Sequence, residues 1–277
     1  MIPAVYIKRD IEFNKNFRSL LEVLKLVAVS QYHTLEEKLR TFPELGGALA
    51  GFFDSIDLGG VRHPFLDPGD APAGVVAVTS DAGLLGGMNM QIISKAAELV
   101  REANGRLVVV GERGQAFAKG LKIPFTYFPG ILDAERRRQS AELRDYLVEE
   151  ILTGKMGPLQ VVYCRAVSLV VQRLEVEALE PFVKRSQEIP SADQIFESTP
   201  ERIVEYLVCL FLGQRLYEIF GINRVAEQAA RFVHLEESSE KISGLNRKLL
   251  LQYFRRRHEI IDQNMRELFA ARSIYAK

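Results

Sequence analysis

The sequence predicts an α/β domain flanked by two long terminal helices that pair as an antiparallel coiled coil. Three observations support this fold class. No proline follows Pro200, the first 40 residues carry apolar side chains at heptad spacing, and the residues between alternate strand-like and helix-like patterns. A continuous helix over residues 200–275 would be on the order of 110 Å long, so it needs another helix to cover its apolar stripe.

The N-terminal helix is predicted to run from Val5 to Arg40, with Pro43 and Gly46-Gly47 leaving its far end open as far as Phe53. Spacings that alternate between four and three residues are typical of a coiled-coil seam. The seam expected at the N-terminus is Tyr6, Phe13, Phe17, Leu20, Leu24, Val27, Leu35 and Leu39. Its expected partner is Leu250, Phe254, Arg257, Ile261, Asn264, Leu268, Ala271 and Tyr275.

The central segment is predicted to form a Rossmann-like domain with a five-stranded mixed sheet. The expected strands are Val75–Thr79, Leu107–Val110, Phe125–Phe128, Leu159–Cys164 and Leu169–Leu179, and the expected helices are Asn89–Asn104, Gln115–Lys119 and Asp133–Leu152. The last two strands are so close in sequence that we expect an antiparallel edge hairpin. Residues 1–57, 58–197 and 198–277 are thus predicted to be the N-terminal helix, the α/β domain and the C-terminal helix.

Composition limits the possible classes of protein. Thirty-six basic residues balance thirty-six acidic ones, so no global field attracts the chain to nucleic acid or to an anionic membrane. The first residues do not resemble a secretory signal, and no apolar run approaches the length of a membrane span, so we expect a soluble protein that stays where it is made. Cys164 and Cys209 lack metal-site or redox spacing and are expected to be buried, reduced thiols.

The loop between the first expected strand and helix, residues 79–89, lies where doubly wound folds bind phosphates. Its glycines at 83, 86 and 87 fit neither the P-loop nor the dinucleotide-binding spacing. We therefore interpret the loop as a tight turn in which Asn89 caps the helix, with ligand binding as the alternative. The four histidines are scattered, so we expect no metal site.

The same loop resembles the signature loop of gamma subunits of rotary F-type ATP synthases. The matching residues are Thr79, Ser80, Asp81, Gly83, Leu84, Gly86, Gly87 and Asn89. The resemblance extends over nearly the whole chain, through His63-Pro64-Phe65, 111–114, 174–181 and the E-x-A-A-R segment 227–231. In the terminal helix it covers Tyr253, Arg257, Ile261, Gln263 and Glu267. Ala82 and Leu85 stand where the family usually has Arg and Cys, so the chain resembles a divergent member.

The resemblance implies a non-catalytic central shaft that transmits torque between a membrane ion-driven ring and a catalytic hexamer. The implied partners are the alpha and beta subunits of the hexamer, an epsilon-type subunit and the ring of c-type subunits. The implied location is peripheral, at the cytoplasmic face of the membrane, with no direct membrane insertion, cofactor or metal.

The resemblance also implies roles for particular residues. Arg257 and Gln263 match positions that hydrogen-bond a loop of a catalytic subunit, and we expect Arg256 and Glu267 to take part in the same contact. The signature loop of Ser80, Asp81, Gly83, Gly86, Gly87 and Asn89 is expected to be structural. The shaft motif is Glu227, Ala229, Ala230 and Arg231.

Two other functions stay open. Basic residues gather on the terminal helix at Arg247, Lys248, Arg255, Arg256, Arg257 and His258. These side chains could bind in a groove of DNA, but neighbouring acidic residues reduce the positive charge of the surface. We therefore favour a charged track that meets acidic loops of a partner protein, and we expect no nucleic-acid binding.

The rival hypotheses for the whole chain are a nucleotide-using enzyme built on the α/β domain and a homodimeric coiled-coil scaffold or DNA-associated protein.

Overall fold

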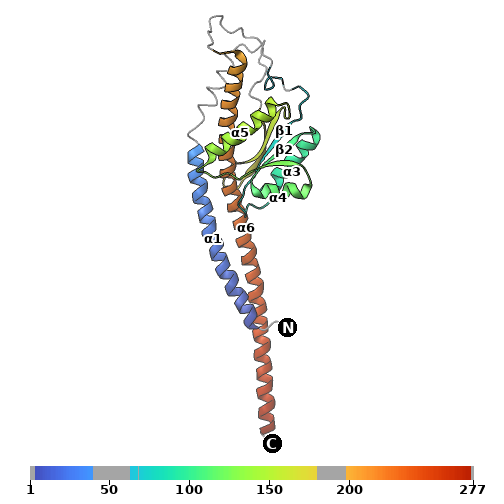
Figure 1. Ribbon diagram of the computed structural model, residues 1–277. Coiled ribbons are helices and arrows are strands. Elements are labelled where there is room, and N and C mark those ends of the chain that lie inside the picture. The colour runs from blue at the N-terminus through green and yellow to red at the C-terminus, as the bar shows by residue number, and fades with distance from the viewer. Residues whose placement is uncertain (1–3, 40–62, 68, 180–197, 276–277) are drawn as a thin grey trace. The chain divides into compact units, whose positions relative to one another are not determined.

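The computed structural model describes residues 4–39, 63–67, 69–179 and 198–275. They belong to two compact units, Met1–Ala28 with Phe232–Lys277, and Val29–Arg231. Two helices contribute to both units, α1 (Ala4–Leu39) and α6 (Pro200–Tyr275). Both are labelled in Figure 1. The end of the N-terminal helix beyond residue 39, the boundary near residue 57 and the linker at 181–197 lie outside the described residues. The division into three segments stays a prediction.

The sheet of the Val29–Arg231 unit has five strands. They are β1 (Gly74–Val78), β2 (Arg106–Val110), β3 (Phe125–Phe128), β4 (Leu159–Ala166) and β5 (Gln172–Ala178). Their order is β3-β2-β1-β4-β5, with β5 antiparallel to β4 and all other neighbours parallel. The prediction of a five-stranded mixed sheet that ends in an antiparallel hairpin is therefore confirmed.

Helices cover both faces of this sheet. Along β1 every residue is buried, because alternate side chains enter two different cores. Val75 and Ala77 pack with α3 (Met88–Glu102) and α4 (Glu112–Leu121). Val76 and Val78 pack with α5 (Arg136–Leu152) and α6. The result is the three-layer α/β arrangement expected from a largely parallel sheet.

Helix α6 is one continuous element of 76 residues, about 114 Å long at the standard rise. The prediction of a single long C-terminal helix is confirmed. Within the Val29–Arg231 unit it buries Val208, Leu212, Leu216, Ile219 and Phe220 against α5 and the sheet. A few turns later Val225 and Ala229 pack against Tyr32 and Leu35 of α1.

In the other unit α1 and α6 run antiparallel. The Asn246 amide donates to the Ile11 carbonyl at 3.5 Å, and the Ser239 hydroxyl donates to Glu22 at 2.9 Å. Lys25 donates to Glu236 at 2.5 Å. As the residue numbers along α1 increase, the residue numbers of their contact partners on α6 decrease. This confirms the predicted antiparallel pairing.

The seam between the two helices differs from the predicted one by one residue. The buried or half-buried positions on α1 that follow one stripe within this unit are Ala4, Ile7, Ile11, Asn14, Leu21, Lys25 and Ala28. Those that follow one stripe on α6 are Leu235, Ser239, Ile242, Asn246, Leu249, Tyr253 and Arg256. The α6 set keeps the alternating spacing of four and three that defines a coiled coil, and the α1 set keeps it except at the exposed Arg18. We call these two sets the inner seam.

The predicted seam residues are mostly exposed, so that part of the prediction is wrong. Exposed positions are Tyr6, Phe13, Phe17, Leu20 and Val27 on α1, and Leu250, Phe254, Arg257, Ile261, Asn264 and Leu268 on α6. Of the set, Leu35 is buried and Leu24 and Leu39 are half-buried. The pattern was dominated by the largest apolar side chains, whereas the inner seam includes Asn14, Lys25 and Ser239. Polar side chains of this kind become recognisable as seam residues only beside their partner helix.

Candidate functional site

The loop that follows β1 hydrogen-bonds to neighbouring segments of the chain. The Thr79 hydroxyl donates to the Val110 carbonyl at 2.5 Å and accepts from the Gly114 N–H at 3.1 Å. The Ser80 hydroxyl donates to the Ala82 carbonyl at 2.9 Å. The two hydroxyls are therefore occupied by hydrogen bonds to the end of β2, to α4 and within the loop itself.

Asn89 has a different role from the predicted cap. The N-cap position of α3 is Gly87, with no side-chain hydrogen bond, and Asn89 lies inside the helix. Its side-chain oxygen accepts from the Ser80 N–H at 3.2 Å, and its amide donates to the Ser80 hydroxyl at 2.9 Å. The capping prediction is wrong because the side chain is turned into the buried loop. Gly86 before it adopts φ +56°, a left-handed conformation that favours glycine.

Asp81 ties this loop to two further segments. Its carboxylate accepts from the Glu112 N–H at 2.7 Å, at the start of α4. An acidic group at a helix N-terminus is favoured by the exposed N–H groups and the helix dipole. A Cβ atom on Gly130 would lie 2.3 Å from the Asp81 carboxyl carbon, so glycine is needed there for the close approach. These contacts support a structural role for the loop.

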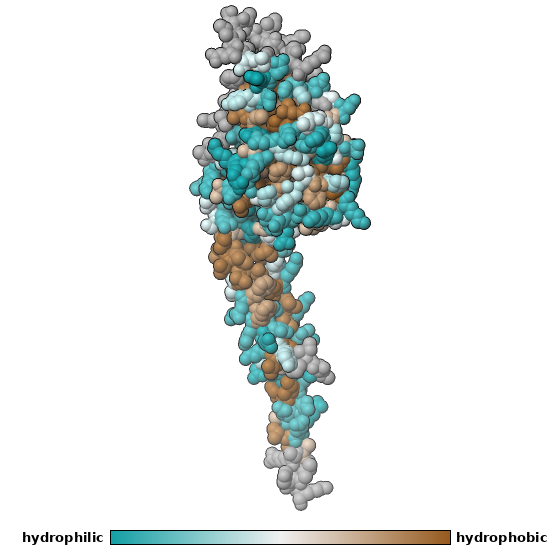
Figure 2. All heavy atoms as spheres, viewed as in Figure 1, coloured by the Kyte–Doolittle hydropathy of each residue, from teal (hydrophilic) through white to brown (hydrophobic). Residues whose placement is uncertain are grey.

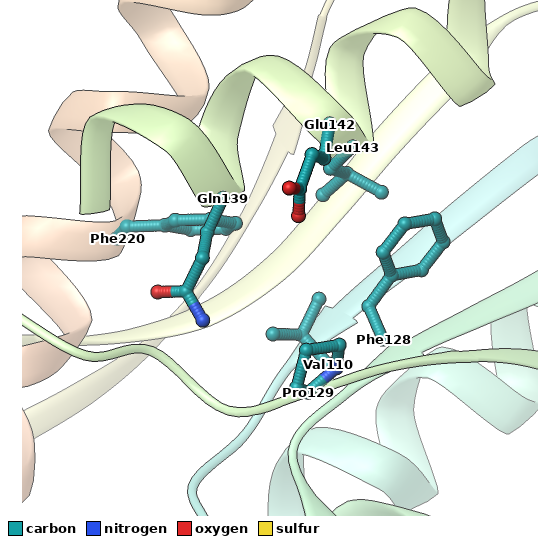
Figure 3. Close-up of a pocket in the computed structure, with 7 residues that line it drawn as sticks. All are labelled: Val110, Phe128, Pro129, Gln139, Glu142, Leu143 and Phe220. Carbon is teal, nitrogen blue, oxygen red and sulfur yellow. The ribbon is translucent and has the colours of Figure 1, made fainter. Parts of the chain in front are cut away.

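A small cavity lies between α5 and the carboxyl ends of β2 and β3. Figure 3 shows Gln139 and Glu142 reaching from α5 toward Val110 and Pro129, with Phe128 beside them. The cavity has a volume of about 10 Å³. One water molecule needs about that much, and small-molecule sites are typically several hundred Å³. A nucleotide does not fit in this cavity.

The shaft motif lies inside the Val29–Arg231 unit. Glu227 is 1% exposed, and Ala229 and Ala230 are buried beside it. Arg224 donates to Glu227 at 2.6 Å, and the Asn223 amide donates at 3.3 Å. Burial raises the pKa of Glu227 to about 7, although the nearby Arg224 and Arg231 act in the opposite direction.

The predicted contact track occupies the C-terminal turns of α6, in the unit formed by Met1–Ala28 and Phe232–Lys277. Arg257, Gln263 and Glu267 are exposed, with Gln263 donating to Glu267 at 3.1 Å. Arg256 is half-buried in the inner seam and forms a 2.5 Å ion pair with Glu259. Three of the four predicted residues are therefore available to a partner, and the fourth is partly occupied within the coil.

A second exposed stripe runs along α1, and we call it the outer stripe. It consists of Tyr6, Phe13, Phe17, Leu20 and Val27, which are 41% to 66% exposed. The rings of Phe13 and Phe17 stack with their centroids 6.1 Å apart. Figure 2 shows apolar side chains at the surface along the two helices. Because α1 carries the inner seam on an adjoining face, its apolar arc is wider than a two-helix coil needs.

The sequence matches a known protein family over nearly its whole length. A family model described as ATP synthase matches residues 5–273. The chain belongs to the ATP synthase family. Among its ATP synthase relatives, a protein named ATP synthase gamma chain from Crocosphaera subtropica is 25% identical, covering 97% of this chain and 98% of the relative. One of the same name from Chlorobaculum tepidum is 26% identical, covering 92% and 93%.

Solved structures of ATP synthases share the fold. A chain in the Euglena gracilis mitochondrial ATP synthase structure of OSCP, F1 and c-ring, rotational state 3, superposes with a TM-score of 0.73 at 18% identity. It covers 98% of this chain and 93% of its own length. A chain in the Tetrahymena thermophila central stalk and c-ring has a TM-score of 0.59 at 17% identity, covering 79% and 99%. The chain is therefore similar to ATP synthase gamma chains in sequence, and it shares its fold with chains of these ATP synthase structures.

Sequence reasoning missed several polar residues of this ATP synthase family member. The structure joins Arg224 to Asp133, with distances of 3.2 and 3.3 Å, although 91 residues separate them. It likewise joins Arg215 of α6 to Glu177 of β5. The i,i+3 spacing of Arg224 and Glu227 was a readable signal, but the long-range partners were not. Within the described residues, no three His, Cys, Asp or Glu side chains form a cluster suited to a metal ion.

Proposed function

We propose that this gamma-type chain is a non-catalytic shaft that transmits torque between a membrane ion-driven ring and a catalytic hexamer. Ion translocation and ATP synthesis or hydrolysis are coupled through its rotation. The observation that carries the proposal is the continuity of α6, which enters the α/β core in one unit and pairs with α1 in the other. One helix without a break is suited to carry a twist from one end to the other.

The α/β domain supports a mechanical rather than a catalytic role. The loop after β1, where a nucleotide would bind, uses its Thr79, Ser80 and Asp81 side chains to hold neighbouring segments. The cavity at the adjoining sheet edge has room for about one water molecule. The catalytic nucleotide sites are accordingly proposed to lie in partner subunits.

The proposed partners are the alpha and beta subunits of the hexamer, an epsilon-type subunit and the c-type ring. We assign the hexamer to the exposed residues of α6, with Arg257 and Gln263 as hydrogen-bond donors to a catalytic subunit and with Arg256 and Glu267 beside them. The ring and the epsilon-type subunit are assigned to the α/β domain. None of the described helices combines the length and apolar composition that a membrane crossing requires. We propose a peripheral location at the cytoplasmic face of the membrane.

The direct test is reconstitution with alpha and beta subunits from a matched source. We expect ATP hydrolysis by the assembled complex to rotate a bead fixed to the α/β domain of this chain. Hydrolysis without bead rotation, or no assembly with matched subunits, would contradict the proposal. Calorimetry on the isolated chain should detect no ATP or NAD binding, and such binding would favour the rival enzyme.

The roles of the α6 residues are tested in the same complex. Arg257→Ala and Gln263→Ala remove side chains proposed to donate hydrogen bonds to the hexamer. The rate of ATP hydrolysis should therefore fall about tenfold in each variant, which corresponds to roughly 1.4 kcal/mol of stabilisation lost with the hydrogen bond. Lys241→Ala is the matched control, because Lys241 is also exposed on α6, at 78% of its side chain. Equal rates for all three variants and the unchanged chain would remove these residues from the contact.

A further inference from the structure

The part of α6 in the Val29–Arg231 unit is held by two kinds of contact. Leu212, Leu216 and Phe220 are buried in the core between the sheet and α5. Burial of this kind is strong but non-directional, and each individual atomic contact is weak. Hydrogen-bonded ion pairs have a defined geometry, so they set the angle of a helix about its own axis more sharply.

The first such contact joins α6 to β5. Arg215 donates through Nε and Nη2 to the two carboxylate oxygens of Glu177, at 2.5 and 2.7 Å. The Tyr163 hydroxyl of β4 donates to the same carboxylate at 2.9 Å. Burial raises the pKa of Glu177, but its hydrogen bonds to Arg215 and Tyr163 outweigh burial and hold the pKa below its usual value. We call this group the β5 anchor.

The second contact joins α6 to the loop before α5 and to β4. Arg224 donates through Nε and Nη2 to the two carboxylate oxygens of Asp133, at 3.3 and 3.2 Å. Its third nitrogen donates to the buried Glu227 at 2.6 Å. The side-chain oxygen of Asn223 accepts from the Cys164 N–H of β4 at 3.1 Å. We call this group the loop anchor.

The two anchors leave α6 in opposite directions. Arg215 and Arg224 are nine residues apart in one helix, which corresponds to two and a half turns. Their Cα atoms therefore lie about 180° apart around the helix axis and about 13 Å apart along it. A twist of α6 against the sheet would stretch the β5 anchor and the loop anchor together.

Resting on the proposed function, we infer that Arg215 with Glu177 and Arg224 with Asp133 are positioning residues for torque transfer. They fix the angle of α6 relative to the α/β domain, so that a turning force applied to the domain reaches the rest of the helix without slip. Their effect is on how much rotation is delivered for each ATP hydrolysed.

The test uses the complete complex in membrane vesicles with Arg215→Met, Asp133→Asn and the double variant. We expect unloaded ATP hydrolysis within about twofold of the unchanged complex, and ion pumping per ATP reduced about fivefold or more in the double variant. The conservative variants Arg215→Lys and Asp133→Glu should retain at least half of the pumping ratio. Arg138→Met is the control, because the ion pairs of Arg138 with described residues are local ones, with Glu135 and Glu142.

The outcomes separate the two levels of the proposal. If the unchanged complex hydrolyses ATP without rotation, the proposed function fails. If it rotates and pumps, and the double variant keeps the same pumping ratio while only its melting temperature falls, the anchors are merely structural and the inference is overturned. Asp133→Asn decides the matter if the double variant does not assemble, because the Asp133 side chain is 39% exposed and its loss leaves the core intact.

Discussion

Helix α6 is held in two different ways along its length. In the Val29–Arg231 unit it buries large apolar side chains such as Leu212, Leu216 and Phe220 against a sheet and a helix. In the other unit its seam with α1 contains Ser239 and Asn246. A two-helix seam buries less apolar area per residue than a three-layer core. The comparison indicates that attachment relies on burial in one unit, whereas alignment with α1 relies on polar seam positions that specify register at some cost in stability.

The largest expected effect is in the apolar half of the helix. Leu216→Ala creates a cavity at a fully buried position and should lower the free energy of unfolding by about 3 kcal/mol. Urea denaturation followed by circular dichroism measures this change. Leu210→Ala is the control, since Leu210 lies on the same helix but is 38% exposed, and should cost far less. Equal losses would show that the core side of α6 is not the stabilising side.

The buried carboxyl of the shaft motif should make this unit sensitive to pH. The pKa of Glu227 is raised from the usual 4.5 to about 7, so between these values the folded chain binds more protons than the unfolded chain. Its contribution therefore lowers the free energy of unfolding as pH rises from about 4.5 to about 7. Glu227→Gln removes this dependence, a difference on the order of 2 kcal/mol between pH 5 and pH 8. If the free energy of unfolding depends on pH in the same way in Glu227→Gln and in the unchanged chain, the raised pKa of Glu227 is contradicted.

The polar seam is tested by making it resemble the apolar core. Asn246 has a buried side-chain oxygen to which none of the described residues donates a hydrogen bond. Asn246→Leu should therefore stabilise the unit formed by α1 and the C-terminal part of α6 by about 1 kcal/mol. Amide hydrogen exchange of residues 232–256 measures the gain, with the exposed Gln252→Leu as control. Faster exchange in Asn246→Leu would mean that the amide holds the register and that its loss outweighs the burial.

The smallest effect on stability is expected at the outer stripe. Phe13 and Leu20 are 66% and 52% exposed, so Phe13→Glu with Leu20→Glu should change the free energy of unfolding by less than about 0.5 kcal/mol. Any self-association of the isolated chain through this stripe should decrease in sedimentation velocity experiments. Assembly with the hexamer should also weaken if the stripe faces a partner. A stable dimer that survives both substitutions would favour the scaffold hypothesis.

The sequence was sufficient for most of the fold because its signals were local. Continuous apolar runs such as 107–110 marked buried parallel strands, and the absence of proline after Pro200 marked α6. The helix seam was predicted one residue away because Phe13 and Leu24 are more apolar than the seam residues Asn14 and Lys25. Which stripe is buried depends on the facing helix, here on Ser239, which accepts a hydrogen bond from Arg18 and donates one to Glu22.

The candidate site was less predictable because its contacts are distant in sequence. The signature loop and the shaft motif were recognised from their residues, but the cap predicted for Asn89 depends on a buried side-chain direction that spacing does not encode. The pair of Arg215 and Glu177 spans 38 residues and two kinds of element. Many charged residues occur in each, so only the fold identifies which two meet.

The half-turn between Arg215 and Arg224 bears on reversibility. A contact on only one side of a helix would resist rotation more strongly in one direction than in the other. Contacts on opposite sides resist rotation equally in both directions. A rotary motor that turns one way to make ATP and the other way to consume it needs such an attachment between the domain that is driven and the helix that it turns.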